Sequence, residues 1–229
     1  MTEVTIQGQA GPRTISDGAT EDVRLGRTAE VIVQELHGRF YEQNYRGNLF
    51  SGGMGITSIS ASTFTTANLT ATETPIIGVY NPSTSTINVV VLQATLSVIQ
   101  NALQATGCGG FVWASSVGNT AITTGSTPLN RRTLVTGGAQ AKDMTNVTPT
   151  GLTNALTVKF GSALNGGSSI PVAFLATQAG AQAQSVTNSV ENFDGGLIVP
   201  PGGILTLVCG TTPVGHSAAS CIVWEEVPI

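Results

Sequence analysis

The stretch of sequence that decides the fold is INVVVLQATLSVI, residues 87–99. Apolar and polar side chains alternate through most of it, with Val90, Leu92, Ala94, Leu96 and Val98 on one predicted face and Gln93, Thr95 and Ser97 on the other. A period of two residues is typical of a β-strand with one buried face. The stretch therefore predicts a half-buried strand.

A helix is the alternative for the same residues. Leu92, Leu96, Ile99 and Leu103 also lie at helical spacing. The run of three valines at 89–91 favours the strand, because β-branched residues are enriched in sheets.

The chain after residue 55 repeats this pattern of short apolar runs divided by turn formers. Gly and Pro in the dividing segments set or permit the backbone angles that turns require. The predicted strands are 61–70, 75–80, 87–99, 110–115, 132–136, 155–160, 170–176, 196–199, 203–209 and 220–227. About ten short strands of this kind predict an all-β fold, a jelly-roll-like β-sandwich, in which Trp113 and Trp224 belong to the core.

Charge divides the chain into two parts. Residues 1–46 hold twelve of the twenty-two charged residues, and the other 183 residues hold ten. We therefore predict an N-terminal docking arm at 1–50, a glycine-rich hinge at 51–55 and a β-sandwich body at 51–229. Arg131 and Arg132 form the one basic doublet and are expected to be solvated in a loop.

Composition argues against two classes of partner. The net charge is −4, and basic residues are scattered rather than gathered, so a nucleic-acid interface is not expected. No run of 18 apolar residues and no secretory signal occur, so neither a membrane span nor export is expected.

The three cysteines, Cys108, Cys209 and Cys221, follow no metal-ligand spacing and are expected to be reduced. The strand-like runs that contain Cys209 and Cys221 could form a hairpin centred on Gly215. Such a hairpin would bring the two sulfurs together, so a disulfide remains an alternative.

Few residues here could perform catalysis. The chain holds two histidines, His37 and His216, so the multi-histidine metal site of cupin enzymes cannot be assembled. His216 is expected in a solvated loop tip, without the glycine-flanked serine of a hydrolase. A metal pair of Glu35 with His37, or a hydrolase that uses Glu191 and Asp194, would lack further convergent groups. We expect no catalytic site, metal or cofactor.

The arm carries the most varied chemistry. It could form a helix from Thr28 to Tyr45 or an extended segment, and Gly38 slightly favours the extended form because glycine costs a helix about 1 kcal/mol. Aromatic and arginine side chains of this kind are enriched at protein interfaces. The predicted subunit or capsid interface comprises Arg27, Leu36, His37, Arg39, Phe40, Tyr41, Tyr45 and Arg46.

Four short motifs of the arm resemble those of small structural proteins of tailed bacteriophages. They are Gly26-Arg27, Leu36-His37-Gly38-Arg39, Phe40-Tyr41-Glu42 and Tyr45-Arg46-Gly47-Asn48, with Phe40 in place of the commoner tyrosine. The segments GVYNPSTSTINVVV and PPGGILTLVCG of the body match more loosely.

The resemblance implies a non-enzymatic virion protein of the capsid decoration or cement type. Such a protein is made in the host cytoplasm, forms a homotrimer with a jelly-roll body, and binds the major capsid protein on the exterior of the shell. The alternative is a fibre or receptor-binding protein that recognises host glycans, which would expose aromatic platforms. An arm that only packs on its own body is a further alternative for the interface residues.

Overall fold

A computed structural model describes residues 40–58, 68–69, 74–100, 111–160, 186–209 and 216–229. The chain divides into two compact units, Met1–Glu42 and Gln43–Ile229. Nearly all of the described residues belong to the second unit.

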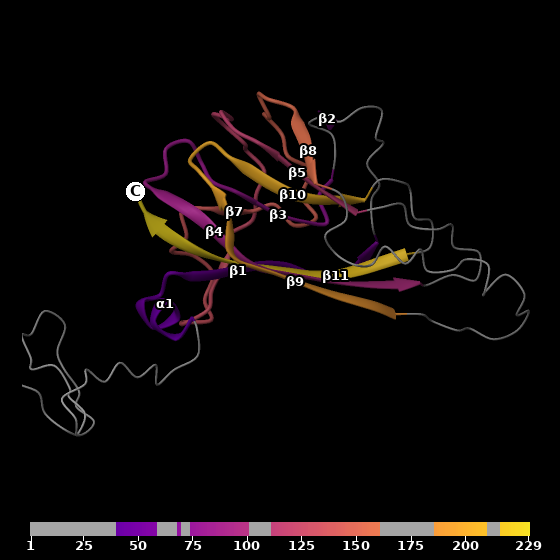
Figure 1. Ribbon diagram of the computed structural model, residues 1–229, viewed down its shortest axis with the longest axis horizontal. Coiled ribbons are helices and arrows are strands. Elements are labelled where there is room, and N and C mark those ends of the chain that lie inside the picture. Colours follow the sequence, from indigo (N-terminus) through magenta and orange to yellow (C-terminus); the bar gives the residue numbers. More distant parts are fainter. Residues whose placement is uncertain (1–39, 59–67, 70–73, 101–110, 161–185, 210–215) are drawn as a thin grey trace, which may run out of the picture. The chain divides into compact units, whose positions relative to one another are not determined.

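The described chain contains one short helix and eleven strands (Figure 1). In chain order they are α1 (Tyr41–Arg46), β1 (Leu49–Ser58), β2 (Asn68–Leu69), β3 (Ile77–Tyr80), β4 (Ile87–Gln100), β5 (Phe111–Ser116), β6 (Leu129–Asn130), β7 (Lys142–Asp143), β8 (Leu156–Phe160), β9 (Val186–Val199), β10 (Ile204–Cys209) and β11 (His216–Pro228). The all-β prediction is confirmed.

The strands form two antiparallel sheets. One has the order β6-β1-β11-β4-β9, and the other has the order β2-β8-β5-β10-β3-β7. Figure 1 shows the two sheets as layers, with β10, β5 and β8 above β1, β11 and β9.

The strand pairing is that of a jelly roll. When the two-residue strands β2, β6 and β7 are set aside, eight strands remain. The first pairs with the eighth (β1 with β11), the second with the seventh (β3 with β10), the third with the sixth (β4 with β9) and the fourth with the fifth (β5 with β8). This nested pairing is the double Greek key, and it confirms the predicted jelly-roll-like sandwich.

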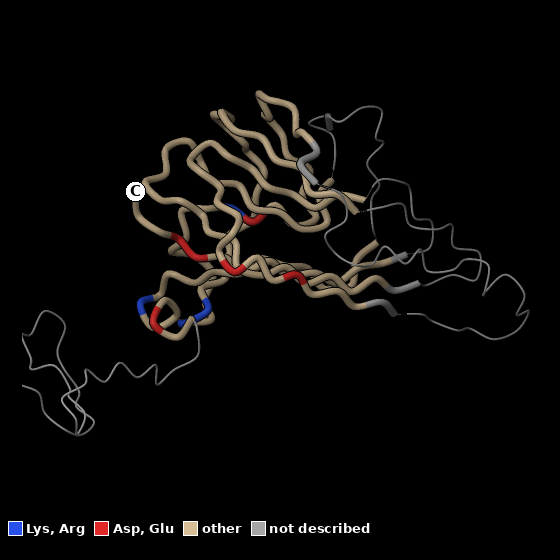
Figure 2. Tube along the Cα trace, viewed as in Figure 1, with Lys and Arg blue, Asp and Glu red and all other residues tan. Residues whose placement is uncertain are grey.

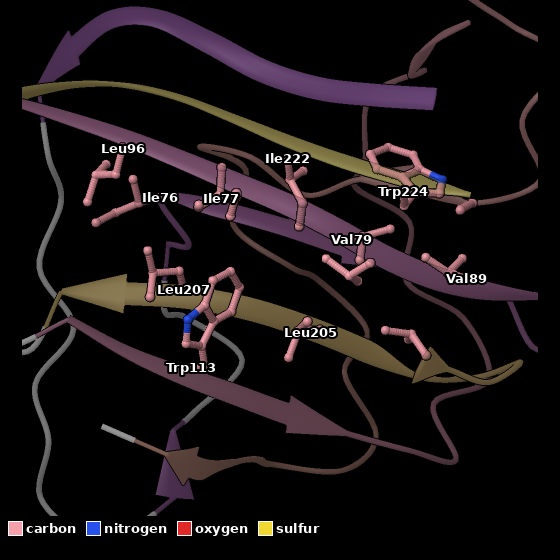
Figure 3. Close-up of a cluster of buried hydrophobic side chains, with 14 of the residues drawn as sticks. Ile76, Ile77, Val79, Val89, Leu96, Trp113, Leu205, Leu207, Ile222 and Trp224 are labelled. Carbon is pink, nitrogen blue, oxygen red and sulfur yellow. The ribbon is translucent and has the colours of Figure 1, made fainter. Parts of the chain in front are cut away.

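The main core lies between the sheets (Figure 3). Trp113 and Leu207 of one sheet face Leu96 and Ile222 of the other in this view. Trp113 and Trp224 are both 0% exposed, so the prediction that they belong to the core is confirmed.

A second, smaller core covers the outer face of the six-stranded sheet. Its buried members include Met144 and Leu156, and partly buried Ile122, Val147 and Leu152 pack against them. Most of these side chains come from the long connection between β5 and β8, residues 117–155. That face of the sheet is therefore buried by a loop and not by a third sheet.

The predicted facing of β4 is right from Leu92 onward and wrong before it. Leu92, Ala94, Leu96 and Val98 are buried as expected. Val89 and Val91 also point inward at 0% exposure, while Val90 is only partly buried. The pairing register shifts between Val91 and Gln93 against both neighbouring strands of β4. A β-bulge of this kind reverses the inside-outside alternation, which a simple period cannot anticipate.

Strand β9 is longer than the predicted 196–199, and a bulge divides it. Asn192 pairs with Gln93 and Leu197 pairs with Val91, so residues 193–196 lie opposite a single residue of β4. Asp194 and Gly195 within the bulge have positive φ values of 51° and 85°. The bulge disrupts the ladder of a long edge strand, which discourages pairing with other chains.

Two predictions about local structure are wrong. The expected hinge at 51–55 lies within β1, where Ser51 pairs with Val223 and Gly53 with Cys221. Residues 132–136 are not a strand: β6 ends at Asn130, and a turn and loop follow. The predicted strand at 170–176 and most of the one at 61–70 lie outside the described residues.

The alternative hairpin of Cys209 with Cys221 is not formed, and both cysteines are reduced thiols, as expected. Cys209 lies in β10 and Cys221 in β11, which belong to different sheets, and the two are not joined. His216 is not at a loop tip but is the first residue of β11, where it pairs with Gln100.

Candidate functional site

Carboxylates in the body are held by structural contacts. Glu191 accepts a hydrogen bond from the Trp113 indole at 3.1 Å, whereas Asp194 is exposed in the β9 bulge. Burial raises the pKa of Glu191, while the bond from Trp113 acts in the opposite direction. Over the described ranges, no three His, Cys, Asp or Glu side chains are placed to hold a metal ion.

The described helix is short. In the described ranges, no helix has the length and apolar character needed to cross a membrane.

The candidate site is an exposed surface built where α1 ends. Gly47 has a φ of 80°, its amide donates to the Asn44 carbonyl at 3.0 Å, and the Asn48 amide donates to the Gln43 carbonyl at 3.0 Å. These two bonds form a Schellman motif, which glycine permits because it adopts positive φ at little cost. The motif turns the chain from α1 into β1.

Asn130 of β6 joins the end of α1 to the loop at 131–136. Its Nδ2 donates to the Gly47 carbonyl at 2.8 Å. Its Oδ1 accepts from the amides of Arg132 at 3.0 Å and Thr133 at 3.2 Å. One side chain therefore fixes both the helix end and the start of the loop.

The arrangement places Arg132 over Tyr45. The guanidinium carbon lies 5.1 Å from the centroid of the Tyr45 ring. A cation–π contact at an exposed site contributes about 0.5–1 kcal/mol, enough to orient the arginine.

Next to this pair, the loop exposes two apolar side chains. Leu134 is 73% exposed, Val135 is 62% exposed and Tyr45 is 60% exposed. Leu134 also has a φ of 58°, an uncommon conformation for a residue that is not glycine. A strained residue that exposes a large apolar side chain suggests contact with another molecule. We call Tyr45, Arg46, Arg132, Leu134 and Val135 the docking surface.

The docking surface is the most basic part of the body. Five of the chain's lysines and arginines follow residue 42, and Arg46, Arg131 and Arg132 are three of them. Figure 2 shows basic segments at α1 and in the chain beside it, together with an acidic segment in α1, whereas the other acidic segments lie along the sheets.

The structure describes half of the predicted interface residues. Phe40 is partly buried, Tyr41 is 44% exposed in α1, and Tyr45 and Arg46 are exposed at its end. Arg27, Leu36, His37 and Arg39 lie outside the described residues, as do Glu35 and residues 28–38 of the predicted arm. The preference for an extended form is wrong for residues 41–46, which are helical.

Sequence reasoning missed the partners of Tyr45. Arg131 and Arg132 are exposed in a loop, as predicted, but Arg132 stacks on an aromatic ring 87 positions earlier in the sequence. Nothing in the sequence near Arg132 signals this contact. Val135, expected in a strand, is instead at the exposed loop.

We predict that Asn130→Ala lowers the free energy of unfolding by about 1–2 kcal/mol, because three hydrogen bonds lose their shared partner at a half-exposed position. Chemical denaturation measures the loss. Amide exchange at Arg132 and Thr133 should become faster. Asn130→Asp is the matched control: it keeps the acceptor for the two loop amides but loses the donor to Gly47, so protection at those amides should persist. Equal protection in Asn130→Ala and wild type would contradict the assigned role.

No family model, curated protein or solved structure matches this chain.

Proposed function

We propose that this protein is a non-enzymatic virion structural component that binds the exterior of a tailed-phage capsid shell and stabilises it. The docking surface is its contact with the major capsid protein. The observation that carries the proposal is the exposed group of Tyr45, Arg132, Leu134 and Val135, held in place by Asn130.

The chemistry of the docking surface supports a protein partner. Tyr and Arg are enriched at the energetic centres of interfaces, and exposed apolar groups beside them contribute buried area. Three arginines at or beside the surface favour an acidic patch on the partner. Many copies on a symmetric shell would make modest individual contacts sufficient.

The outer face of the five-stranded sheet supports self-association into a trimer. Side chains that alternate with the inward Ile222 and Trp224 on β11 are Ala219, Cys221, Val223 and Glu225. Burial raises the pKa of the Glu225 carboxyl. A face with little charge has a small desolvation cost when it is covered by another subunit.

The alternative of a glycan-binding fibre protein would use exposed aromatic platforms. Trp113 and Trp224, the tryptophans considered for that role, are both fully buried. Neither supplies a platform, so the capsid proposal is favoured.

The proposal predicts that Arg132→Ala weakens attachment to shells by about tenfold, since a central interface arginine often contributes more than about 1 kcal/mol. Leu134→Ser should have an effect of similar size. Shells assembled from the major capsid protein encoded with this chain are mixed with each variant, and bound protein is measured by cosedimentation. Light scattering on each variant alone, without shells, reports its oligomeric state.

Lys142→Gln is the matched control, because it removes a basic side chain on β7 that is outside the docking surface. It should bind shells like wild type. Attachment that is unchanged in both Arg132→Ala and Leu134→Ser would refute this assignment of the surface. A wild-type protein that never attaches to shells would refute the capsid proposal itself.

A further inference from the structure

A pocket of about 480 Å³ opens beside β7, at the edge of the six-stranded sheet. Three separate segments form it: the turn between β3 and β4, residues 120–122, and the chain at Gln140 and Lys142. Its volume lies within the range of about 300–1,000 Å³ that is typical of small-molecule sites. It does not include any residue of the docking surface.

Side-chain hydrogen bonds tie the walls of the pocket to one another. The Ser83 hydroxyl donates to the Thr120 carbonyl at 3.1 Å. The Gln140 side chain accepts from the Thr86 amide at 2.9 Å and donates to the Thr86 hydroxyl at 3.2 Å. The pocket is therefore formed before a ligand arrives, which reduces the ordering cost of binding.

One wall carries a cation that lacks a partner. Lys142 is partly buried, and its ammonium makes no ion pair or hydrogen bond to the described part of the chain. Its neighbour Asp143 cannot neutralise it, because successive strand residues point to opposite faces and the Asp143 carboxylate binds the Gly53 amide. Gly125 packs closely on the lysine stem, where a Cβ would come within 2.9 Å of the lysine Cβ. The stem is thus confined, while the charged end has no acceptor among the described residues.

The remaining lining is part polar and part apolar. The hydroxyls of Thr84 and Thr120 make no hydrogen bond to described residues and can donate to a ligand or accept from it. Pro82, Ala121 and Ile122 supply apolar surface on the same pocket.

We propose that this pocket binds an acidic sugar, a pyranose that carries a carboxylate, with the Lys142 ammonium on the carboxylate. A sugar ring has an apolar C–H face and a rim of hydroxyls, which match the apolar wall and the two threonine hydroxyls. A charge-assisted hydrogen bond to a carboxylate is about twice as strong as a neutral one, so the lysine selects acidic over neutral sugars. This site is independent of the proposed capsid contact.

The test uses the full-length protein with D-glucuronate and N-acetylneuraminate, and with neutral D-glucose for comparison. Calorimetry and ligand-observed NMR measure binding. We expect millimolar or tighter binding of at least one acidic sugar and about tenfold weaker binding of glucose. Lys142→Gln should weaken binding of the acidic sugar about tenfold, and binding should also weaken as salt rises.

Arg132→Ala is the control, since it removes a basic side chain outside the pocket and should leave sugar binding unchanged. Thr120→Val should weaken binding a few-fold without affecting the thermal melt. The proposal is overturned if no acidic sugar binds at millimolar concentration, if glucose binds equally well, or if Lys142→Gln binds like wild type. Because shell attachment is measured separately, failure of the sugar site leaves the capsid proposal unaffected, and the reverse holds as well.

Discussion

Trp113→Ala is expected to lower the free energy of unfolding by about 3–5 kcal/mol, the range for removing a large aromatic side chain from a core. Trp113 is 0% exposed in the core between the sheets. The Phe193 ring packs edge-on against it, with centroids 5.3 Å apart and planes at 82°. The loss removes contacts with both sheets, so chemical denaturation should show a clearly lower midpoint or an unfolded protein.

The two buried tryptophans provide a matched comparison that avoids a large cavity. Trp113 donates its indole N–H to Glu191, whereas the Trp224 indole N–H has no hydrogen-bond partner among described residues. Trp113→Phe should therefore lower the free energy of unfolding more than Trp224→Phe does, because it also leaves the partly buried Glu191 carboxylate without its donor. An equal or reversed order would show that the Trp113–Glu191 bond contributes nothing to stability.

Asp143→Ala is expected to lower the free energy of unfolding by about 2–4 kcal/mol, because two backbone amides would lose their acceptors. The Asp143 carboxylate is 5% exposed and accepts from the amides of Thr145 at 2.8 Å and Gly53 at 3.1 Å. It also accepts from the Ser126 hydroxyl at 3.3 Å. This one side chain links β7 to β1, across the two sheets. Glycine at position 52 provides the space for this carboxylate, since a Cβ there would overlap it.

The cost of Asp143→Ala should also depend on pH. Burial raises the pKa of Asp143 above its usual 3.8, and the hydrogen bonds from Thr145, Ser126 and Gly53 only partly oppose this. The Asp143 carboxyl therefore keeps its proton to a higher pH in the folded protein than in the unfolded chain, where its pKa is 3.8. Its contribution to the free energy of unfolding is fully present below pH 3.8 and is lost as pH rises through the folded-state pKa. The difference between wild type and Asp143→Ala should therefore be largest near pH 4 and smaller at pH 8.

Denaturation of both proteins across this pH range provides the measurement. Ser126→Ala is the milder control, since it removes one hydroxyl donor and leaves the two amide bonds to Asp143 intact. Ser126→Ala should lower the free energy of unfolding less than Asp143→Ala does at every pH. If the difference in free energy of unfolding between wild type and Asp143→Ala grew with pH, the pKa of Asp143 would be lowered by its hydrogen bonds and not raised by burial.

Much of the fold was predictable from local sequence. The apolar run at 203–209 is β10, the alternating run at 87–99 is β4, and the strand predicted at 196–199 is the end of β9, directly before two prolines. These features could be predicted because they depend on residues next to each other in the chain. The phase of β4 was mispredicted before Leu92, at Val89–Val91, because a bulge at Leu92 shifts the register against both neighbouring strands.

The candidate sites were less predictable. Tyr45 and Arg46 were expected at an interface from residue type alone, but Arg132 and Leu134 join them only because Asn130 connects the end of α1 to a loop more than eighty residues later. Likewise, the pocket at Lys142 combines a turn, a loop segment and an edge strand that are separate in sequence. No local pattern reports which distant side chains share a surface.

The sequence by itself determined the class of this protein: an all-β body with little charge, buried tryptophans and turns at glycine and proline. Only the tertiary structure decided the nested pairing of β1 with β11, the placement of Cys209 and Cys221 in different sheets, and the burial of the outer sheet face by residues 117–155. The physical reason is that the alternation of apolar and polar residues along the chain indicates which side chains are buried, and this pattern lies in residues next to each other in the sequence. Strand partners depend on long-range contacts, and many arrangements satisfy the same local pattern.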